Sequence, residues 1–206
     1  MIKSNSCIGS VNVSRETIEK LEHLSALITK WTKAINLIAP KSVQDLWDRH
    51  IVDSAQIYHC SPNGWTRWID LGSGGGLPAL VVAIIDQQKR SMTLIESDKR
   101  KCLFLKTARR ELDLDINVIN SRIIDVEIAK ADIISARALA PLTDLLSYAD
   151  QFLHQDGTAI FPKGVRYQEE LDQAAKDWHF DVNAHTSQTN SDARVLEISR
   201  IIRREA

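Results

Sequence analysis

The spacing of hydrophobic residues along the 206-residue chain changes at the turn SPNG, and the two sides predict different structures. Before the turn, apolar residues recur at helical intervals from Ile18 to Trp31, and Ser14 has the side chain of a helix cap just ahead of them. A second helical pattern covers residues 43–58. This part of the chain therefore predicts a helical N-terminal extension over residues 1–62.

After the turn, short apolar runs alternate with helical patterns. The runs predict strands at 68–71, 92–96, 116–120, 132–136 and 158–161, and the patterns between them predict helices at 78–86, 98–112, 139–153 and 166–175. Such alternation is typical of a parallel sheet covered on both faces. Two further strand-like runs, 179–188 and 193–201, have no helix between them and indicate an antiparallel end to the sheet. Residues 63–206 are thus predicted to form an α/β domain with a doubly wound, mostly parallel sheet.

Composition places the chain among ordinary globular proteins, with 44% hydrophobic and 26% charged residues. The formal net charge of -1 gives no overall attraction to nucleic acid, so any such binding needs a local basic patch. Cys7, Cys60 and Cys102 are spaced neither as a disulfide framework nor as a zinc site, which indicates a reducing compartment. No signal peptide is evident, and the longest apolar run, 77–85, is far shorter than the roughly 20 residues that cross a bilayer. We expect a cytoplasmic protein with no membrane segment and no metal site.

The stretch IDLGSGGGLP holds four of the chain's eight glycines, all within residues 72–76. It lies between the first predicted strand and a helix that begins at Pro78, which is where a doubly wound sheet opens its ligand crevice. Glycine lets the backbone approach a ligand closely, and a helix start offers free N–H groups. The dinucleotide fingerprint needs a third glycine where Leu77 stands, so the loop does not favour a pyrophosphate ligand.

Two carboxylates narrow the choice of ligand. Asp70, two residues before Gly72, is unfavourable beside a diphosphate but suits an ammonium group. Glu96 ends the second predicted strand, where a carboxylate accepts hydrogen bonds from both ribose hydroxyls. Together with the loop, these features favour S-adenosylmethionine as the cofactor. The alternative is a tight structural turn with an incidental acid.

Further motifs surround the glycine loop: NLIAP and DRHIVDS before it, and LIESDKRKCLFL, NSRIID, ISARALAPL and FPKG after it. Through these motifs the chain resembles the small-subunit ribosomal RNA methyltransferase G family, also called glucose-inhibited division protein B. Ala79 stands where the family usually has glycine, and alanine fits a first helical turn. The resemblance implies a class I methyltransferase fold that transfers a methyl group from S-adenosylmethionine to N7 of one guanine in 16S ribosomal RNA. Its partner would be that RNA, bare or within the small ribosomal subunit, and we expect the enzyme to be a monomer.

The resemblance also implies which residues contact the cofactor. They are Gly72, Leu77, Ile123, Ile124 and Arg137, with Gly74 on the same loop as the first two. Ile123 and Ile124 follow the third predicted strand, where backbone N–H groups can hold an adenine, and the alternative is that both are core residues. Arg137 follows the fourth strand, so its guanidinium should reach the cofactor or the incoming nucleotide. A surface salt bridge is the other interpretation of this arginine.

Other polar residues are candidates for contact with the substrate. Arg49, His50, Asp53 and Ser54 lie on one predicted helix, and the last three share a face. This cluster either faces RNA and closes the crevice, or forms a packing network between the extension and the main domain. Lys163 ends the fifth predicted strand, where it either meets a phosphate or is simply solvated.

The helix predicted at 98–112 has a basic side and an apolar side. The basic residues are Lys99, Lys106 and Arg110, and the apolar residues opposite are Phe104, Leu105, Ala108 and Leu112. Contact with RNA phosphates and plain solvation are both consistent with such a face, and only phosphate contact would make binding depend on salt.

Guanine N7 carries a lone pair, so it can attack a methyl group without first losing a proton. No general base is then required, and we name no catalytic residue. Two rivals remain outside methyl transfer: a nicotinamide-dependent oxidoreductase on the same kind of sheet, and an interaction module without catalysis. Within methyltransferases, the near-neutral charge leaves a small-molecule substrate as a further alternative.

Overall fold

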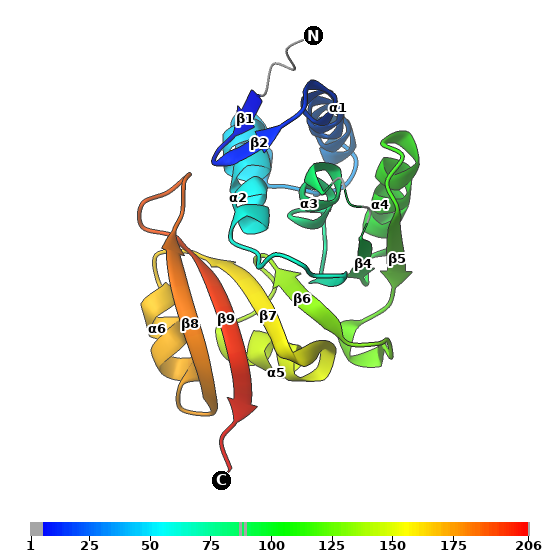
Figure 1. The fold of residues 1–206 in the computed structure, drawn as a ribbon. Coiled ribbons are helices and arrows are strands. Elements are labelled where there is room, and N and C mark those ends of the chain that lie inside the picture. Colours follow the sequence, from blue (N-terminus) through cyan, green and yellow to red (C-terminus); the bar gives the residue numbers. More distant parts are fainter. Residues whose placement is uncertain (1–5, 87, 89, 206) are drawn as a thin grey trace.

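Seven strands form the central sheet of the computed structural model, which describes residues 6–86, 88 and 90–205 (Figure 1). Their order across the sheet is β5-β4-β3-β6-β7-β9-β8. The strands are β3 (Arg67–Leu71), β4 (Ser91–Glu96), β5 (Ile116–Asn120), β6 (Ala131–Ala136), β7 (Leu153–Lys163), β8 (Trp178–Thr186) and β9 (Arg194–Arg203). Strands β3 to β7 pair in parallel, while β9 runs antiparallel to both β7 and β8. The predicted fold class, including its antiparallel end, is therefore confirmed.

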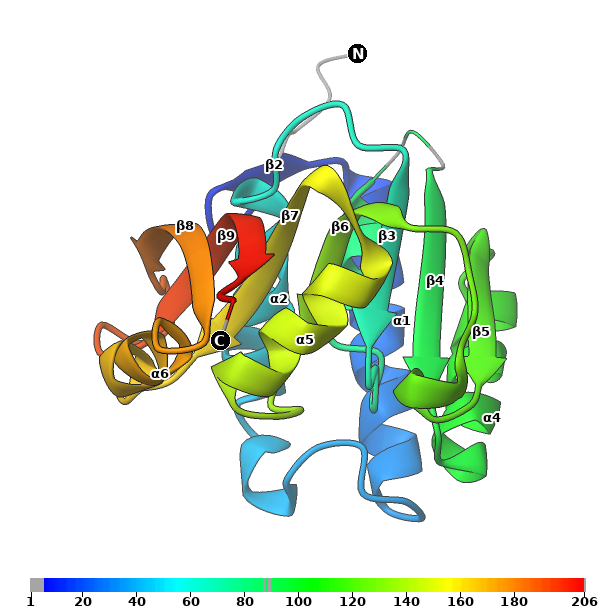
Figure 2. The ribbon, with the colours of Figure 1, turned by 90° about the horizontal axis from the view of Figure 1, so that it is seen from below.

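Helices cover both faces of the sheet. They are α1 (Arg15–Thr32), α2 (Asp53–His59), α3 (Ala79–Ile85), α4 (Lys99–Glu111), α5 (Leu142–Phe152) and α6 (Tyr167–Ala174). Figure 2 shows α1 and α5 on opposite faces, and the buried side chains divide in the same way into two clusters. Because β3, β4 and β6 are parallel neighbours, their carboxyl ends meet at one edge of the sheet.

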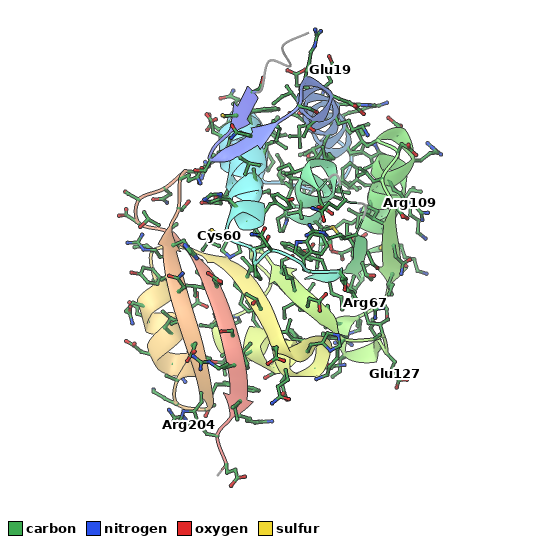
Figure 3. All side chains as sticks on the ribbon, in the orientation of Figure 1. Glu19, Cys60, Arg67, Arg109, Glu127 and Arg204 are labelled. Carbon is green, nitrogen blue, oxygen red and sulfur yellow. The ribbon has the colours of Figure 1, made fainter. Side chains whose placement is uncertain are left out.

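The described part of the N-terminal extension shares its core with one face of the sheet. Ser14 caps α1 by accepting a hydrogen bond from the Thr17 N–H at 3.2 Å, as the sequence predicts. The apolar side of α1 is buried in the same cluster as α3 and α4, and the Trp31 ring meets Phe104 edge-on at 5.7 Å. Side chains fill the space between these helices (Figure 3). The boundary near residue 62 remains a prediction drawn from the sequence pattern.

Several local features differ from the predictions. A short hairpin of β1 (Ser6–Ile8) and β2 (Val11–Val13) precedes α1 and was not expected. The helix predicted at 43–58 starts later than expected, and its first part is a π-helical segment, η2 (Trp47–Val52), that continues directly into α2. The chain also passes directly from α5 into β7 at Leu153, so that strand begins five residues before the predicted start at 158. Among the described residues, no helix has the length and apolar character that crossing a membrane requires.

Candidate functional site

The glycine loop between β3 and α3 needs glycine for three different reasons. Gly72, Gly74 and Gly76 have φ angles of +60°, +55° and +77°, a region that side chains with a Cβ rarely adopt. At Gly76 a Cβ would also lie 2.3 Å from the Leu80 side chain. Gly75 has an ordinary φ, but a Cβ there would come within 3.0 Å of the Leu37 carbonyl oxygen. Part of the glycine cluster thus serves packing rather than a ligand.

Gly74 is the open position of this loop. A Cβ at Gly74 would meet nothing closer than the Gly72 carbonyl oxygen at 3.7 Å, so there is room for a ligand against the backbone. At Gly72 a Cβ would instead meet the tip of Leu139 at 2.5 Å. Leu139 therefore covers one side of the loop, and Gly74 leaves the other side open.

The buried Glu96 carboxylate holds the open side of the loop in place. Its two oxygens accept hydrogen bonds from the N–H groups of Gly74 and Asp98, both at 2.8 Å. Asn120 donates to the Glu96 backbone carbonyl at 3.0 Å and so fixes the strand end that carries the acid. Because a carboxylate oxygen accepts more than one hydrogen bond, both oxygens retain capacity for ribose hydroxyls.

Asp70 is almost fully buried beneath the loop, with one of its two carboxylate oxygens unpaired. Oδ1 accepts a hydrogen bond from the Ser135 hydroxyl at 2.5 Å, and Ser135 in turn accepts from the Trp68 indole at 2.8 Å. Oδ2 has no partner among the described residues. Burial raises the pKa of Asp70 to about 6, although the hydrogen bond from Ser135 lowers it. A positively charged ligand group would compensate this carboxylate.

The three apolar residues that are predicted to contact the cofactor occupy different environments. Leu77 is buried in the core next to the loop. Ile123 is partly buried, whereas the side chain of Ile124 is 70% exposed, so the interpretation of both as core residues is wrong for Ile124. Both lie in the short 3₁₀ turn η3 (Ile123–Asp125) after β5, where the first N–H groups have no partner within the turn. The backbone interpretation of this pair stays a prediction.

A cleft of about 1140 Å³ opens beside the glycine loop, at the carboxyl ends of β6 and β7. Residues of η2 and α2 line it, and so does the loop between β8 and β9, which is hydrogen-bonded to α2. Leu139 lines the cleft and also covers Gly72, so the cleft and the glycine loop are neighbours. The arrangement offers two adjoining spaces, one against the glycine backbone and one above β6.

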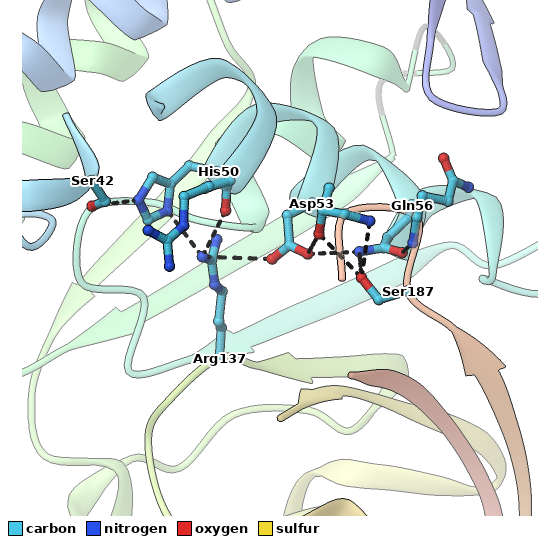
Figure 4. Close-up of polar contacts among 9 residues, drawn as sticks. Ser42, His50, Asp53, Gln56, Arg137 and Ser187 are labelled. Atoms are coloured by element: carbon cyan, nitrogen blue, oxygen red, sulfur yellow. Dashed lines mark hydrogen bonds and ion pairs between the residues drawn. The ribbon is translucent and has the colours of Figure 1, made fainter. Parts of the chain in front are cut away.

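Arg137 lines this cleft, and Figure 4 shows its contacts with η2 and α2. Its Nη2 donates to Nδ1 of His50 at 2.9 Å and to the carbonyl oxygen of Arg49 at 3.1 Å, and it stands 3.5 Å from the Asp53 carboxylate. Its Nη1 is buried and has no partner among the described residues. Burial lowers the pKa of Arg137, and the Asp53 charge opposes this shift. The salt bridge of the alternative interpretation is therefore present, with Asp53 as its partner, but it is mostly buried rather than on the surface.

The cluster that begins at Arg49 contains residues that line the cleft and residues that join the extension to the main domain. Arg49 is exposed and lines the cleft. His50 and Asp53 belong to a hydrogen-bonded network between the extension and the main domain, as the packing interpretation expects. The Ser54 hydroxyl is buried without a partner among the described residues. Contact of any of these residues with RNA stays a prediction.

Lys163 lies at the expected edge of the sheet, but it is neither solvated nor free. Its Nζ donates to the Ala140 carbonyl oxygen at 2.9 Å and to Glu170 at 2.7 Å. The same Glu170 oxygen accepts from the Leu142 N–H at the start of α5. The predicted solvated strand end is therefore wrong, since Lys163 joins β7, α5 and α6. It also lines the cleft, so a phosphate there would have to compete with Glu170.

Sequence reasoning missed the residues that complete the network around Asp53. Asp53 Oδ1 accepts from Gln56 at 2.7 Å and from Thr189 at 2.8 Å, and the Gln56 oxygen accepts from the Gln188 N–H at 3.0 Å. Ser42 contacts His50 from the other side at 2.9 Å. These partners are far apart in the chain or outside any predicted motif, so no spacing pattern identifies them.

Helix α4 has the two predicted sides. Its four predicted apolar residues are buried, and Lys99, Lys106 and Arg110 are exposed together with Arg109 (Figure 3). Of these cations, none forms an ion pair among the described residues. The basic side is therefore available to a polyanion.

Comparison of the sequence with known proteins identifies close relatives over nearly the whole chain. The family model described as rRNA small subunit methyltransferase G matches residues 17–198. A protein named Ribosomal RNA small subunit methyltransferase G from Ruegeria pomeroyi is 45% identical over 198 residues, which cover 95% of this chain and 97% of the relative. A protein of the same name from Rhizobium meliloti is 42% identical over 204 residues, covering 96% and 95%.

Solved structures share the fold at much lower identity. The ribosomal protein L11 methylase from Lactobacillus delbrueckii subsp. bulgaricus superimposes with a TM-score of 0.59 at 19% identity, covering 74% of this chain and 78% of that one. The O-methyltransferase TomG from Streptomyces achromogenes, solved with SAM, gives a TM-score of 0.60 at 10% identity and covers 92% of each chain. At these identities the likeness concerns the fold alone.

Proposed function

This chain belongs to the rRNA small subunit methyltransferase G family, and we propose that it transfers a methyl group from S-adenosylmethionine to N7 of one guanine in 16S ribosomal RNA. Family membership makes the protein an S-adenosylmethionine-dependent ribosomal RNA methyltransferase. The N7 position, the single target guanine and the residues assigned below are the proposal. The observation that carries the site is the unpaired, buried Asp70 oxygen beneath a loop that Gly74 leaves open.

The residues around the glycine loop fit the cofactor. Gly74 leaves space against the backbone, Glu96 can accept from two ribose hydroxyls, and Asp70 provides negative charge near a positively charged ligand. When bound, S-adenosylmethionine supplies a methyl group attached to a positively charged sulfur. The remaining assigned contacts are Gly72, Leu77, the backbone N–H groups of Ile123 and Ile124, and Nη1 of Arg137.

We assign the guanine to the cleft beside Leu139. Guanine N7 needs no base to remove a proton, so the residues of the cleft have to align N7 with the methyl group rather than transfer a proton. Positioning of this kind lowers a barrier by about 7 to 11 kcal/mol. Arg49 at the cleft wall and the basic side of α4 are the proposed contacts for RNA phosphates.

Family membership decides against the alternatives weighed from the sequence. Relatives named as ribosomal RNA methyltransferases over almost the full length of the chain leave no basis for a nicotinamide-dependent oxidoreductase or an interaction module. The same names decide against a small-molecule substrate. Association with the assembled small subunit and a monomeric state remain parts of the proposal.

The decisive experiment maps the methyl group. The pure protein is incubated with radiolabelled S-adenosylmethionine and either bare 16S RNA or assembled small subunits from cells that lack the enzyme. Borohydride reduction followed by aniline cleaves RNA at N7-methylguanine, so a single cleavage that depends on the enzyme supports the proposal. A transcript made with 7-deazaguanosine, which has no N7, serves as the control. Label that survives in this transcript, or label without cleavage, would place the methyl group on another atom.

A further inference from the structure

The side chain of His50 has a protonation state that its hydrogen bonds fix. The Ser42 hydroxyl donates its only proton to the Ala39 carbonyl oxygen at 2.8 Å. Ser42 must therefore accept from Nε2 of His50, which lies 2.9 Å away and must carry a hydrogen. Arg137 can only donate, so Nδ1 of His50 must be an unprotonated acceptor. These contacts require the neutral Nε2–H tautomer.

The surroundings of His50 agree with this assignment. Burial, together with the charges of Arg137 and Arg49, lowers the pKa of His50 to about 4. The ring is therefore neutral at physiological pH and accepts a hydrogen bond from a cation without competing for charge. Ser42 belongs to η1 (Pro40–Ser42), so a loop of the extension sets the tautomer of a ring in η2.

This acceptor determines how the guanidinium of Arg137 is oriented. Its two Nη2 hydrogens are taken by His50 and by the Arg49 carbonyl, while Nη1 is a buried donor without a partner among the described residues. Asp53 competes for the same guanidinium, but it is held at 3.5 Å by its own bonds to Gln56 and Thr189. Without the His50 acceptor, the attraction of Asp53 would turn the guanidinium into a paired arrangement (Figure 4).

We propose that His50 is a positioning residue: as a neutral imidazole whose tautomer is set by Ser42, it holds Arg137 so that Nη1 faces an oxygen of the bound reactants. This inference rests on the proposed function, because the acceptor is either a carboxylate of the cofactor or an oxygen of the RNA. Both sources present the same chemistry, an oxygen that accepts from a guanidinium. His50 itself touches neither reactant in this scheme.

The test compares two amide replacements of similar size. His50→Asn places an amide oxygen near the position of Nδ1 and keeps an acceptor for Arg137, whereas His50→Gln places its amide near Nε2 and loses that acceptor. Calorimetry gives the affinity for S-adenosylmethionine, and steady-state rates with small subunits give KM for each reactant and kcat. Circular dichroism and melting curves establish that each variant is folded.

The proposal predicts that His50→Gln and His50→Ala weaken the binding of one reactant by about tenfold or more, which is the loss expected for a hydrogen bond to a charged group. The binding of both reactants to His50→Asn should stay within about threefold of wild type. A change in cofactor affinity identifies the cofactor as the source of the oxygen, and a change in the KM for RNA alone identifies the RNA. Equal loss in the folded Asn and Gln variants, or no loss in either, would overturn the positioning role.

Ser42 supplies a second, independent readout. Ser42→Ala removes the group that selects the tautomer of His50, so in the wild-type background it should weaken the binding of the same reactant. In the His50→Asn background there is no tautomer to select, and Ser42→Ala should add nothing. Additive effects in the double variant would show that Ser42 acts only through packing. If the wild-type protein failed to methylate RNA, the proposed function would fail, whereas a loss of cofactor affinity in folded His50→Gln but not in His50→Asn would still support the positioning role.

Discussion

The buried carboxylate of Asp70 leads to a prediction in which stability and ligand binding change in opposite directions. Asp70→Asn keeps an oxygen to accept from Ser135 but removes the charge. Because burial raises the pKa of Asp70 from 3.8 to about 6, the folded state binds this proton more tightly than the unfolded chain does. The stabilisation from that proton is fully present below pH 3.8 and is lost as the pH rises through about 6.

The size of the effect follows from the same shift. A rise from 3.8 to about 6 corresponds to about 3 kcal/mol, since each pKa unit is worth about 1.36 kcal/mol. Asp70→Asn should therefore recover up to about 3 kcal/mol at pH 8, or about 6 to 12 °C in Tm for a chain of this length, and nothing below pH 4. Its affinity for S-adenosylmethionine at pH 8 should fall by about tenfold or more, because the ligand loses a buried counter-charge.

Denaturation at pH 4, 6 and 8 measures the first effect, and calorimetry at pH 8 measures the second. Asp132→Asn is the matched control. The Asp132 carboxylate accepts from the N–H groups of Thr66 and Arg67, and although burial raises its pKa, these hydrogen bonds outweigh burial and lower it. The same isosteric change there should cost stability at pH 8 and leave cofactor affinity unchanged.

Two results would refute the reasoning about Asp70. A gain in Tm of equal size at pH 4 and pH 8 would show that relief of a buried charge is not its source. Unchanged affinity for S-adenosylmethionine in a folded Asp70→Asn protein would remove Asp70 from the cofactor site. The two measurements are independent, so one part of the argument can fail while the other stands.

Three further predictions concern the loop, the sheet edge and the RNA surface. Gly74→Ala should weaken cofactor binding far more than Gly64→Ala, as measured by calorimetry. Both glycines have a positive φ and open space around them, but only Gly74 belongs to the glycine loop between β3 and α3. Equal effects would mean that backbone strain alone is responsible. Lys163→Met should lower the free energy of unfolding by about 1 to 3 kcal/mol in urea titrations, since its half-buried carboxylate partner Glu170 loses its cation. An unchanged midpoint would contradict this. Lys106→Ala should reduce the slope of log affinity for RNA against log salt by about 0.7 to 0.9. Lys176→Ala, on the opposite side of the sheet, is the control and should leave the slope unchanged. Equal slopes in both variants would argue against phosphate contact by α4.

The sequence predicts those parts of the fold that depend on local pattern. Helix α1 with its Ser14 cap, the order of strands and helices after residue 62, and the two-sided α4 all follow from spacing and are confirmed. The β1–β2 hairpin has strands of only three residues, too short for alternation to be recognised. The π-helical segment η2 contains no proline or glycine that would indicate it in the sequence.

The predicted site is incomplete where its residues depend on tertiary partners. Lys163 was placed at the correct edge of the sheet, but its pairing with Glu170 depends on how α6 folds back onto β7. Likewise, the motif around His50 was recognised, but the bond from Ser42 that fixes its tautomer was not. A pattern in the sequence can bring residues to one edge of a sheet, whereas their hydrogen-bond partners come from packing that the pattern does not encode.

The N-terminal extension contacts the site at two separate points. One of them accounts for a glycine in the loop between β3 and α3. A Cβ at Gly75 would lie only 3.0 Å from the Leu37 carbonyl oxygen, so this tight contact with the extension, rather than any ligand, favours glycine there. The second point is the chain of bonds from Ser42 through His50 to Arg137. A boundary near residue 62 therefore separates two sequence patterns but runs through one site, because the segment before it both packs on the cofactor loop and orients an arginine beside it.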